Sequence, residues 1–342
     1  MFESIDLNLV WFILIGILFS GYAILDGFDL GTGTVYPFIK GDINKRYLLN
    51  AVGPVWDGNE VWLIVGGGAL FAAFPFVYAT VFSGFYLAFM LLLLALILRA
   101  VSIEFRSQQP WNWWRKTWGA GFSTGSIMAS ILIGVAMGNI TRGIPLDTDG
   151  NYTGTFLELL NPYSILLGVT TLFLFAMHGC IYLIMKTEGE TQEQVKKILR
   201  PCMFGFIVLI ILHTIVTLLY IPHAREGIAQ NPWILILVFM AAASIAMIPV
   251  FMYKGYHGWA FLSSVSTMGC MMSIFGATMF PHLVYCNTNP ELSLTLYNAS
   301  ATTKSLEVMT VIALIGVPLV LAYSAAIYWV FRGKVVLTER SY

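Results

Sequence analysis

Charge is what this sequence has least of. Only 11% of its 342 residues are Asp, Glu, Lys or Arg, against about 25% in an average soluble domain. The 18 basic and 18 acidic side chains balance to a net charge of zero, so the basic excess that binds nucleic acid is missing. Hydrophobic residues make up 58% of the chain. These proportions predict an all-α protein integral to a membrane and exclude a nucleic-acid-binding role.

Other common signals are also missing. The four cysteines, Cys180, Cys202, Cys270 and Cys286, have no paired metal-ligand spacing, so no metal site is expected. The acidic start MFESID lacks the basic region of a cleaved signal peptide, and we expect the first apolar run to remain as a membrane span. No segment between the apolar runs is long enough for a separate soluble domain. We therefore expect one membrane domain over residues 1–342.

Apolar runs dominate what is there. A helix needs about 20 apolar residues to cross the hydrocarbon core, and nine runs qualify. They cover residues 8–33, 50–74, 76–99, 117–139, 162–186, 202–222, 230–252, 256–280 and 307–331. The sequence therefore predicts nine transmembrane helices.

The Lys and Arg residues predict the orientation. With the N-terminus outside, only Arg142, Arg225 and Lys304 of the 18 basic residues fall on the outer side. Cytoplasmic loops carry the excess of Lys and Arg in membrane proteins, so the C-terminus is predicted to be cytoplasmic. Between the fifth and sixth spans, the mixed charges of 187–201 predict a short, solvated cytoplasmic helix.

Six charged side chains stand inside or at the ends of the first three spans, all toward the predicted cytoplasmic side. They are Asp26, Asp29, Asp57, Glu60, Arg99 and Glu104. Asp57 and Glu60 are three residues apart, which places both on one helix face. At about 1.5 Å per residue, they lie roughly 10 and 15 Å inside the second span. Trp56, four residues before Glu60, shares that face approximately.

An ionisable group inside a membrane costs at least about 2.5 kcal/mol, so this group of acids requires a reason. One interpretation is a proton-uptake path, in which desolvated carboxyls take up and pass on protons. The other is a structural network, in which Arg99 compensates one or two of the acids. Both interpretations stay open at this point, and they are compatible with each other.

Two histidines lie inside predicted spans. His178 and His213 are candidate haem ligands, but they stand on different helices and have no Met or Cys partner at a telling spacing. Hydrogen-bonded packing is the favoured interpretation for both. Most tryptophans fall near span ends, as in an aromatic belt, whereas Trp62 lies deeper.

Several longer stretches are distinctive together. They are GYAILDGFDLG (21–31), GPVWDGNEVWL (53–63), GGGALFAAFPFVY (66–78) and LRAVSIEFR (98–106). With further matches up to the last span, the chain resembles subunit II of the cytochrome bd quinol oxidases. The segment WDGN followed by VW is the most specific match.

The resemblance implies a fold and an activity. The fold would be two four-helix bundles, about 8–139 and 162–280, and a peripheral ninth helix at about 307–331. The oxidase complex, in the plasma membrane of a prokaryote, oxidises quinol, reduces O2 to water and builds a proton gradient. Two b-type haems and one d-type haem belong to subunit I, so subunit II would carry no haem and no catalytic residue.

The resemblance also implies roles for particular residues. Asp57 matches the carboxylate at the mouth of a proton path shared with subunit I, and Asp26, Asp29 and Arg99 match the polar cluster near it. Trp62 lies where O2 access toward the d-type haem has been proposed for the family. No family role attaches to Glu60, which would either extend the proton path or steady it.

The implied partners are subunit I, membrane quinol and O2. A small single-span accessory subunit and a structural quinone occur in some members, and the sequence places neither. It also does not distinguish ubiquinol from menaquinol. The alternative is a cation- or proton-coupled transporter, which uses intramembrane acids at helix breaks. The acids lie near one face here, and no inverted repeat is visible.

Overall fold

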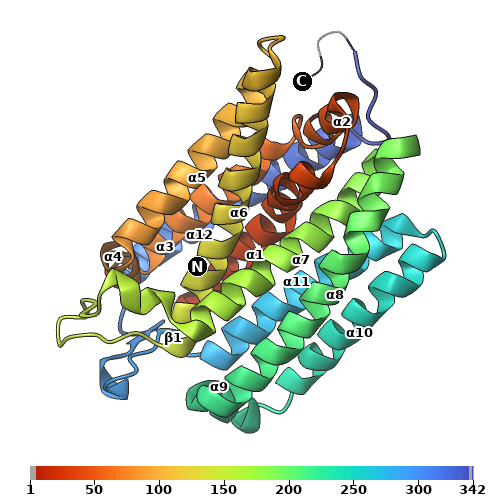
Figure 1. Ribbon diagram of the computed structural model, residues 1–342. Coiled ribbons are helices and arrows are strands. Elements are labelled where there is room, and N and C mark those ends of the chain that lie inside the picture. The colour runs from red at the N-terminus through yellow and green to blue at the C-terminus, as the bar shows by residue number, and fades with distance from the viewer. Residues whose placement is uncertain (1–4, 339–340, 342) are drawn as a thin grey trace.

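The computed structural model describes residues 5–338 and 341, and the chain is almost entirely helical (Figure 1). The α-helices are α1 Leu7–Val35, α2 Asp42–Val52, α3 Trp56–Ala73, α4 Pro75–Gly84, α5 Tyr86–Phe105, α6 Asn112–Arg142, α7 Pro162–Lys186, α8 Gly189–Tyr220, α9 Pro222–Gln230, α10 Ile234–Tyr253, α11 His257–Met279 and α12 Thr303–Val330. Three 3-10 turns are η1 Tyr36–Phe38, η2 Phe156–Leu160 and η3 Pro290–Leu292. Two short strands, β1 His282–Val284 and β2 Leu294–Thr295, pair antiparallel.

Eight of the described helices are long and apolar enough to cross a membrane. Each overlaps a predicted span, which confirms an all-α, multi-pass membrane protein. The predicted span 50–74 is the one without a counterpart among them, because α3 begins with a polar turn that contains Asp57 and Glu60. The count of nine spans and their division into two bundles stay predictions.

Two boundaries differ from the predicted ones. The run 76–99 is not one helix, because the chain breaks at Phe85 between α4 and α5, and α5 continues to Phe105. The segment 187–201 is helical from Gly189 on, but it is not a separate short helix, since residues 189–201 are the first turns of the continuous helix α8. The buried positions Thr191, Val195 and Leu199 recur every four residues and continue the face that α8 buries.

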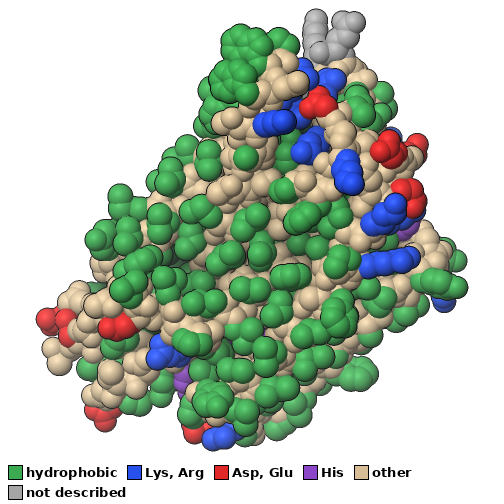
Figure 2. Space-filling view, viewed as in Figure 1, with side chains coloured by type: hydrophobic (Ala, Val, Ile, Leu, Met, Phe, Trp, Pro, Cys, Tyr) green, Lys and Arg blue, Asp and Glu red, His purple; other side chains and the backbone are tan. Residues whose placement is uncertain are grey.

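The molecule has two chemically different ends. The α2 end holds α2, the last turns of α1, α5 and α7, and the first turns of α3, α6 and α8; the β1 end holds β1 and α9 (Figure 1). Figure 2 shows Lys and Arg gathered toward the α2 end of the visible face. Arg142, Arg225 and Lys304 lie instead in the last turn of α6, in α9 and at the start of α12. This asymmetry agrees with the bias read from the sequence.

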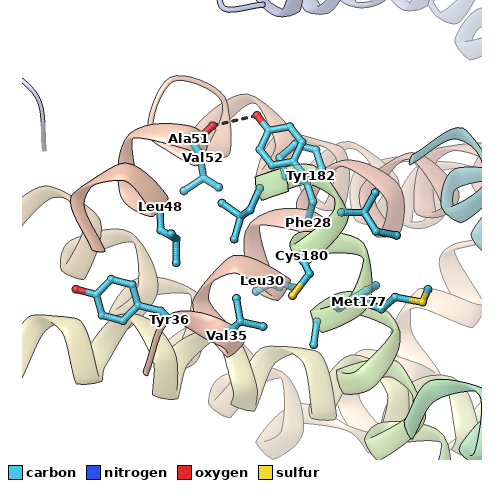
Figure 3. Packing of buried hydrophobic residues seen from close by; sticks show 14 of the residues in the cluster. Phe28, Leu30, Val35, Tyr36, Leu48, Ala51, Val52, Met177, Cys180 and Tyr182 are labelled. Atoms are coloured by element: carbon cyan, nitrogen blue, oxygen red, sulfur yellow. Dashed lines mark hydrogen bonds between the residues drawn. The ribbon is translucent and has the colours of Figure 1, made fainter. Parts of the chain in front are cut away.

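Helix α1 is the central element and contacts α3, α6, α7 and α11. Its last turns pack with α2 and α7 in the main hydrophobic core (Figure 3). There the hydroxyl of Tyr182 on α7 donates to the backbone oxygen of Ala51 at 3.0 Å, which fixes α2 across the end of α7. The labelled side chains are Phe28, Leu30, Val35, Tyr36, Leu48, Ala51, Val52, Met177, Cys180 and Tyr182.

Helix α12 lies at the periphery. Its buried residues are Leu306 and Thr310. The indole nitrogen of Trp11 on α1 binds both: it donates to the Leu306 carbonyl at 3.3 Å and to the Thr310 hydroxyl at 3.0 Å. Beside it, the loop before α12 pairs with the loop after α6 through a bridge between Ile144 and Cys286. These loops bury the Cys286 thiol and close the β1 end.

The crossing of α1 and α7 is close because two glycines face each other. A Cβ added to Gly179 would lie 2.6 Å from the carbonyl carbon of Gly31 and 2.7 Å from the Thr32 amide nitrogen. Both obstacles are backbone atoms, which cannot rotate away. Small residues at helix crossings let backbones approach in this way in membranes.

Replacement of Gly179 by Ala is therefore expected to destabilise the protein by about 1–3 kcal/mol, since overpacking forces backbone shifts. The thermal unfolding midpoint of the detergent-extracted protein measures the effect. Gly16→Ala on α1 is the matched control, because an added Cβ there meets no atom within 4 Å. Equal midpoints for the two variants would contradict the close crossing.

Candidate functional site

A charged cluster lies where α1, α3 and α5 meet toward the α2 end. The Arg99 side chain on α5 is fully buried and pairs with two acids: Nη1 lies 2.5 Å from Asp26 Oδ1, and Nη2 lies 3.0 Å from Glu60 Oε2. Asp26 is also fully buried, whereas the Glu60 side chain is 20% exposed. One guanidinium therefore joins α1, α3 and α5.

A glycine on α6 explains why Arg99 is enclosed. A Cβ on Gly125 would lie 2.5 Å from the Ala95 carbonyl oxygen and 3.0 Å from the Arg99 amide nitrogen. The backbone of α6 thus presses on α5 at this point, and the long Arg99 side chain is covered. A charge held in this way must be paired, because an isolated ion in a low-dielectric interior is very costly.

A second branch of hydrogen bonds holds Asp29. The side-chain amide of Asn59 donates to Asp29 Oδ2 at 2.7 Å, and the hydroxyl of Tyr328 donates to Asn59 Oδ1 at 2.7 Å. This branch connects α12 through α3 to α1. We call the set Asp26, Asp29, Asn59, Glu60, Arg99 and Tyr328 the Arg99 cluster.

The Arg99 cluster keeps unused hydrogen-bonding capacity. Asp26 Oδ2, Asp29 Oδ1, Arg99 Nε and the Tyr22 hydroxyl are buried and have no hydrogen-bond partner among the described residues. Buried polar atoms are normally paired, and three carboxyls face a single guanidinium. The cluster therefore has free acceptor positions on two acids, which a group that exchanges protons requires.

The structure brings together only some of the predicted residues. Asp26, Asp29, Glu60 and Arg99 meet, whereas Asp57 stands exposed in the first turn of α3 and makes no hydrogen bond or ion pair within the described part of the chain. Trp56 is half-buried and packs against the main core, and its place in the proton path or polar cluster stays a prediction. Carboxyl burial thus increases from Asp57 through Glu60 to Asp26.

Two further predicted residues lie outside the Arg99 cluster. Glu104 is half-buried, five residues beyond Arg99 on α5. Trp62 is half-buried against α1, where a Cβ on Gly21 would lie 2.6 Å from its ring atom Cζ3. Trp62 is thus a packing residue between α1 and α3, and its predicted part in O2 access stays a prediction.

The two candidate haem ligands are poorly arranged for a haem. Both ring nitrogens of His178 are engaged, Nδ1 with Ser264 Oγ at 2.8 Å and Nε2 with the Ile24 carbonyl at 3.0 Å. The ring also stacks on Phe261, with centroids 4.8 Å apart. His213 packs beside the Tyr163 ring at 5.0 Å. Ligation by His178 would break two buried hydrogen bonds, so these residues do not fit an axial ligand pair.

Asn59 and Tyr328 were not among the predicted site residues. Asn59 could have been identified from the sequence, since it is an amide in the first turns of an apolar run and belongs to the WDGN segment. Nothing in the sequence pointed to Tyr328, because its partner Asn59 is 269 positions away. No group of three or more His, Cys, Asp and Glu in the described residues is arranged to hold a metal ion.

Comparison with known proteins finds one family that matches most of the chain. The model of the family "Cytochrome bd terminal oxidase subunit II" matches residues 7–331. Cytochrome bd-I ubiquinol oxidase subunit 2 of Escherichia coli (strain K12) is 33% identical over 362 residues, covering 96% of this chain and 95% of the relative. Cytochrome bd ubiquinol oxidase subunit 2 of Bacillus subtilis (strain 168) is 35% identical over 335 residues, covering 96% and 97%.

A solved structure has the same fold. A chain of the bd oxidase from Geobacillus thermodenitrificans superposes with a TM-score of 0.77 and covers 95% of this chain and 98% of its own length. The two sequences are only 16% identical, so this likeness concerns the fold alone.

Removal of the Arg99 charge is expected to destabilise the protein strongly. Arg99→Gln leaves buried carboxylates without their cation, and breaking a buried pair costs about 3–5 kcal/mol. The double variant Arg99→Gln with Asp26→Asn removes one of the stranded charges as well and is expected to recover part of the loss.

Thermal unfolding of Arg99→Gln, of Asp26→Asn and of the double variant in detergent measures this coupling. Lys196→Gln serves as the control, since its pair with Glu193 at 2.7 Å lies on the surface and such pairs contribute little. If the double variant is as unstable as the sum of its single variants, Arg99 and Asp26 are not coupled.

Proposed function

Because the chain belongs to the cytochrome bd terminal oxidase subunit II family and is thus a terminal oxidase subunit, we propose that it is the non-haem subunit of a quinol:O2 oxidoreductase. The partner is a haem-bearing subunit I, which oxidises quinol and reduces O2 to water. The complex lies in the plasma membrane of a prokaryote and builds a proton gradient. This chain supports assembly and supplies protons from the α2 end, which faces the cytoplasm.

The observation that carries the proposal is the graded burial of three carboxyls. Asp57 is exposed, the Glu60 side chain is 20% exposed, and Asp26 is fully buried. Glu60 and Asp26 both pair with Arg99. Asp57 collects protons at the mouth, and Glu60 passes them to the Arg99 cluster. Carboxyls spaced in this way carry protons inward without a continuous water-filled pore, which would leak the gradient.

Each remaining group has a distinct task in this scheme. Arg99 stays charged, because a guanidinium is not deprotonated in proteins, so it fixes the two acids and repels other cations. The Asn59 amide is a positioning group, since its nitrogen donates to Asp29 and cannot deliver a proton as a carboxyl does. Asp29 contacts this neutral amide rather than a cation, and the proposal assigns it an exchangeable proton.

The proposed complex also includes an O2 route beside Trp62. Trp62 borders an apolar route for O2 toward the partner's haems. A structural quinone and a single-span accessory subunit are compatible with the fold. A cation transporter is not favoured, because family membership points to an oxidase and because Arg99, a fixed positive charge, occupies the centre of the acid cluster.

Asp57→Asn in the assembled oxidase is expected to lower quinol-dependent O2 consumption by roughly tenfold or more, since a positioned proton donor contributes about 10²–10⁴-fold to the step it serves. Haem content is measured on the same sample by absorbance. The haems are expected to remain, because Asp57 makes no internal hydrogen bond or ion pair within the described residues.

Asp149→Asn is the control, an exposed aspartate in the loop at the β1 end, and it is expected to leave turnover unchanged. Unchanged turnover in Asp57→Asn would remove Asp57 from the proton supply. Loss of the haems together with activity would show that Asp57 maintains assembly, and the structural network would then be the better account.

A further inference from the structure

A second polar feature lies at the α2 end, apart from the Arg99 cluster. It is a cavity of about 540 Å³ between η1, the start of α2, the end of α5 and the start of α6. Four cationic side chains line it, Lys45, Arg106, Arg115 and Lys116, together with Asp42 and Tyr36. We call it the basic cavity.

The basic cavity has more positive charge than its own acid can neutralise. Asp42 accepts from Arg106 Nη2 at 2.5 Å and from Arg115 Nη1 at 3.2 Å, so one carboxylate is shared between two guanidinium groups. Lys45 Nζ lies 4.9 Å above the centre of the Tyr36 ring. Four cations against one carboxylate leave an excess that attracts an anion.

Arg106 gives the strongest indication of a ligand. Its side chain is only 3% exposed, yet Nε and Nη1 have no hydrogen-bond partner among the described residues. The Tyr36 hydroxyl, on a residue only 2% exposed, is likewise unpartnered there. Such buried donors are normally satisfied, and a guanidinium fork with two free donors matches the oxygens of a phosphate.

The helix geometry favours the same kind of ligand. Both α2 and α6 begin at the cavity, with Asp42 and Asn112 as their first residues. The start of a helix carries a partial positive charge and free N–H groups that attract anions. Burial, and after it the charge of Arg106, lowers the pKa of Lys45, and a bound anion would offset this effect.

The neighbouring residues place the cavity at the membrane surface. Trp111 is the N-cap of α6, and Trp113 is the second residue of that helix. The two residues are 51% and 60% exposed. Tryptophans in such positions sit at the headgroup level of a bilayer. A ligand at this depth is supplied by the membrane at high local concentration.

We propose that the basic cavity binds the phosphate of an anionic phospholipid headgroup. Arg106 and Arg115 hold the phosphate oxygens, and Lys45 and Lys116 add charge at the rim. Zwitterionic lipids carry the same phosphate with a compensating cation, so the excess charge of the cavity selects against them. Basic pockets between helices bind anionic headgroups by the same chemistry.

The test uses the full chain extracted with whatever subunits co-purify. Native mass spectrometry follows the binding of dioctanoyl phosphatidylglycerol, of dioctanoyl phosphatidylcholine and of inorganic phosphate. The test variant is Lys45→Gln with Lys116→Gln, which spares the buried Arg106. The control is Lys197→Gln with Lys254→Gln, two exposed lysines of the same end outside the cavity.

The anionic lipid is expected to bind the unaltered protein and the control equally, and to bind the test variant roughly 10–30-fold more weakly, because each lysine contributes about 1 kcal/mol near an anionic lipid. Equal binding by the two lipids, or equal loss in test and control variants, would overturn the proposal. Inorganic phosphate binding as tightly as the lipid would show that the cavity takes a soluble anion instead.

Arg106→Gln is the second variant. It removes the two unpartnered donors and is expected to abolish preferential binding of phosphatidylglycerol in protein that still unfolds cooperatively. Retained preference in that variant would also overturn the proposal, since the buried guanidinium would then have no part in it.

Discussion

The buried guanidinium of Arg99 is the constraint on which the packing at the α2 end of this molecule depends. Its side chain is fully buried, so its charge is tolerable only with carboxylates in contact. Asp26 and Glu60 provide them from α1 and α3, and the pairs therefore fix how those helices lie against α5. The glycines at 31, 125 and 179 complete this arrangement, because each allows a close backbone contact that a larger residue would block.

Burial also shows where charge is allowed. Among the described residues, the buried Asp, Glu, Lys and Arg side chains are Asp26, Asp29, Arg99 and Arg106, and all lie toward the α2 end. The β1 end instead holds an apolar core that includes Phe74, Phe85 and Cys286. Beyond Asp26 toward the β1 end, the described residues include no further buried acid. In the proposed scheme, a proton that reaches Asp26 must therefore leave sideways, toward the partner subunit.

The sequence was sufficient for the membrane class, the positions of most spans and the polar residues at the α2 end. Hydropathy and the distribution of Lys and Arg are properties of single residues, so they can be read without a structure. Contacts between particular side chains cannot be read from the sequence in this way. Glu60 and Arg99 are 39 positions apart, and Asn59 and Tyr328 are 269 positions apart, so only helix packing brings them together. The continuity of α8 was missed because charged residues cover its exposed face while Val195 and Leu199 are buried on the other.

Arg99 and Arg106 show how depth decides what an arginine binds. They are seven residues apart, Arg99 in α5 and Arg106 at the C-cap of that helix, which is two turns of one face and about 10 Å along the axis. The deeper residue is fully buried, and the chain supplies two acids for it. The outer residue has one carboxylate, which it shares with Arg115. Because Arg106 lies at the level of the tryptophans that mark the membrane surface, an external anion can complete its coordination.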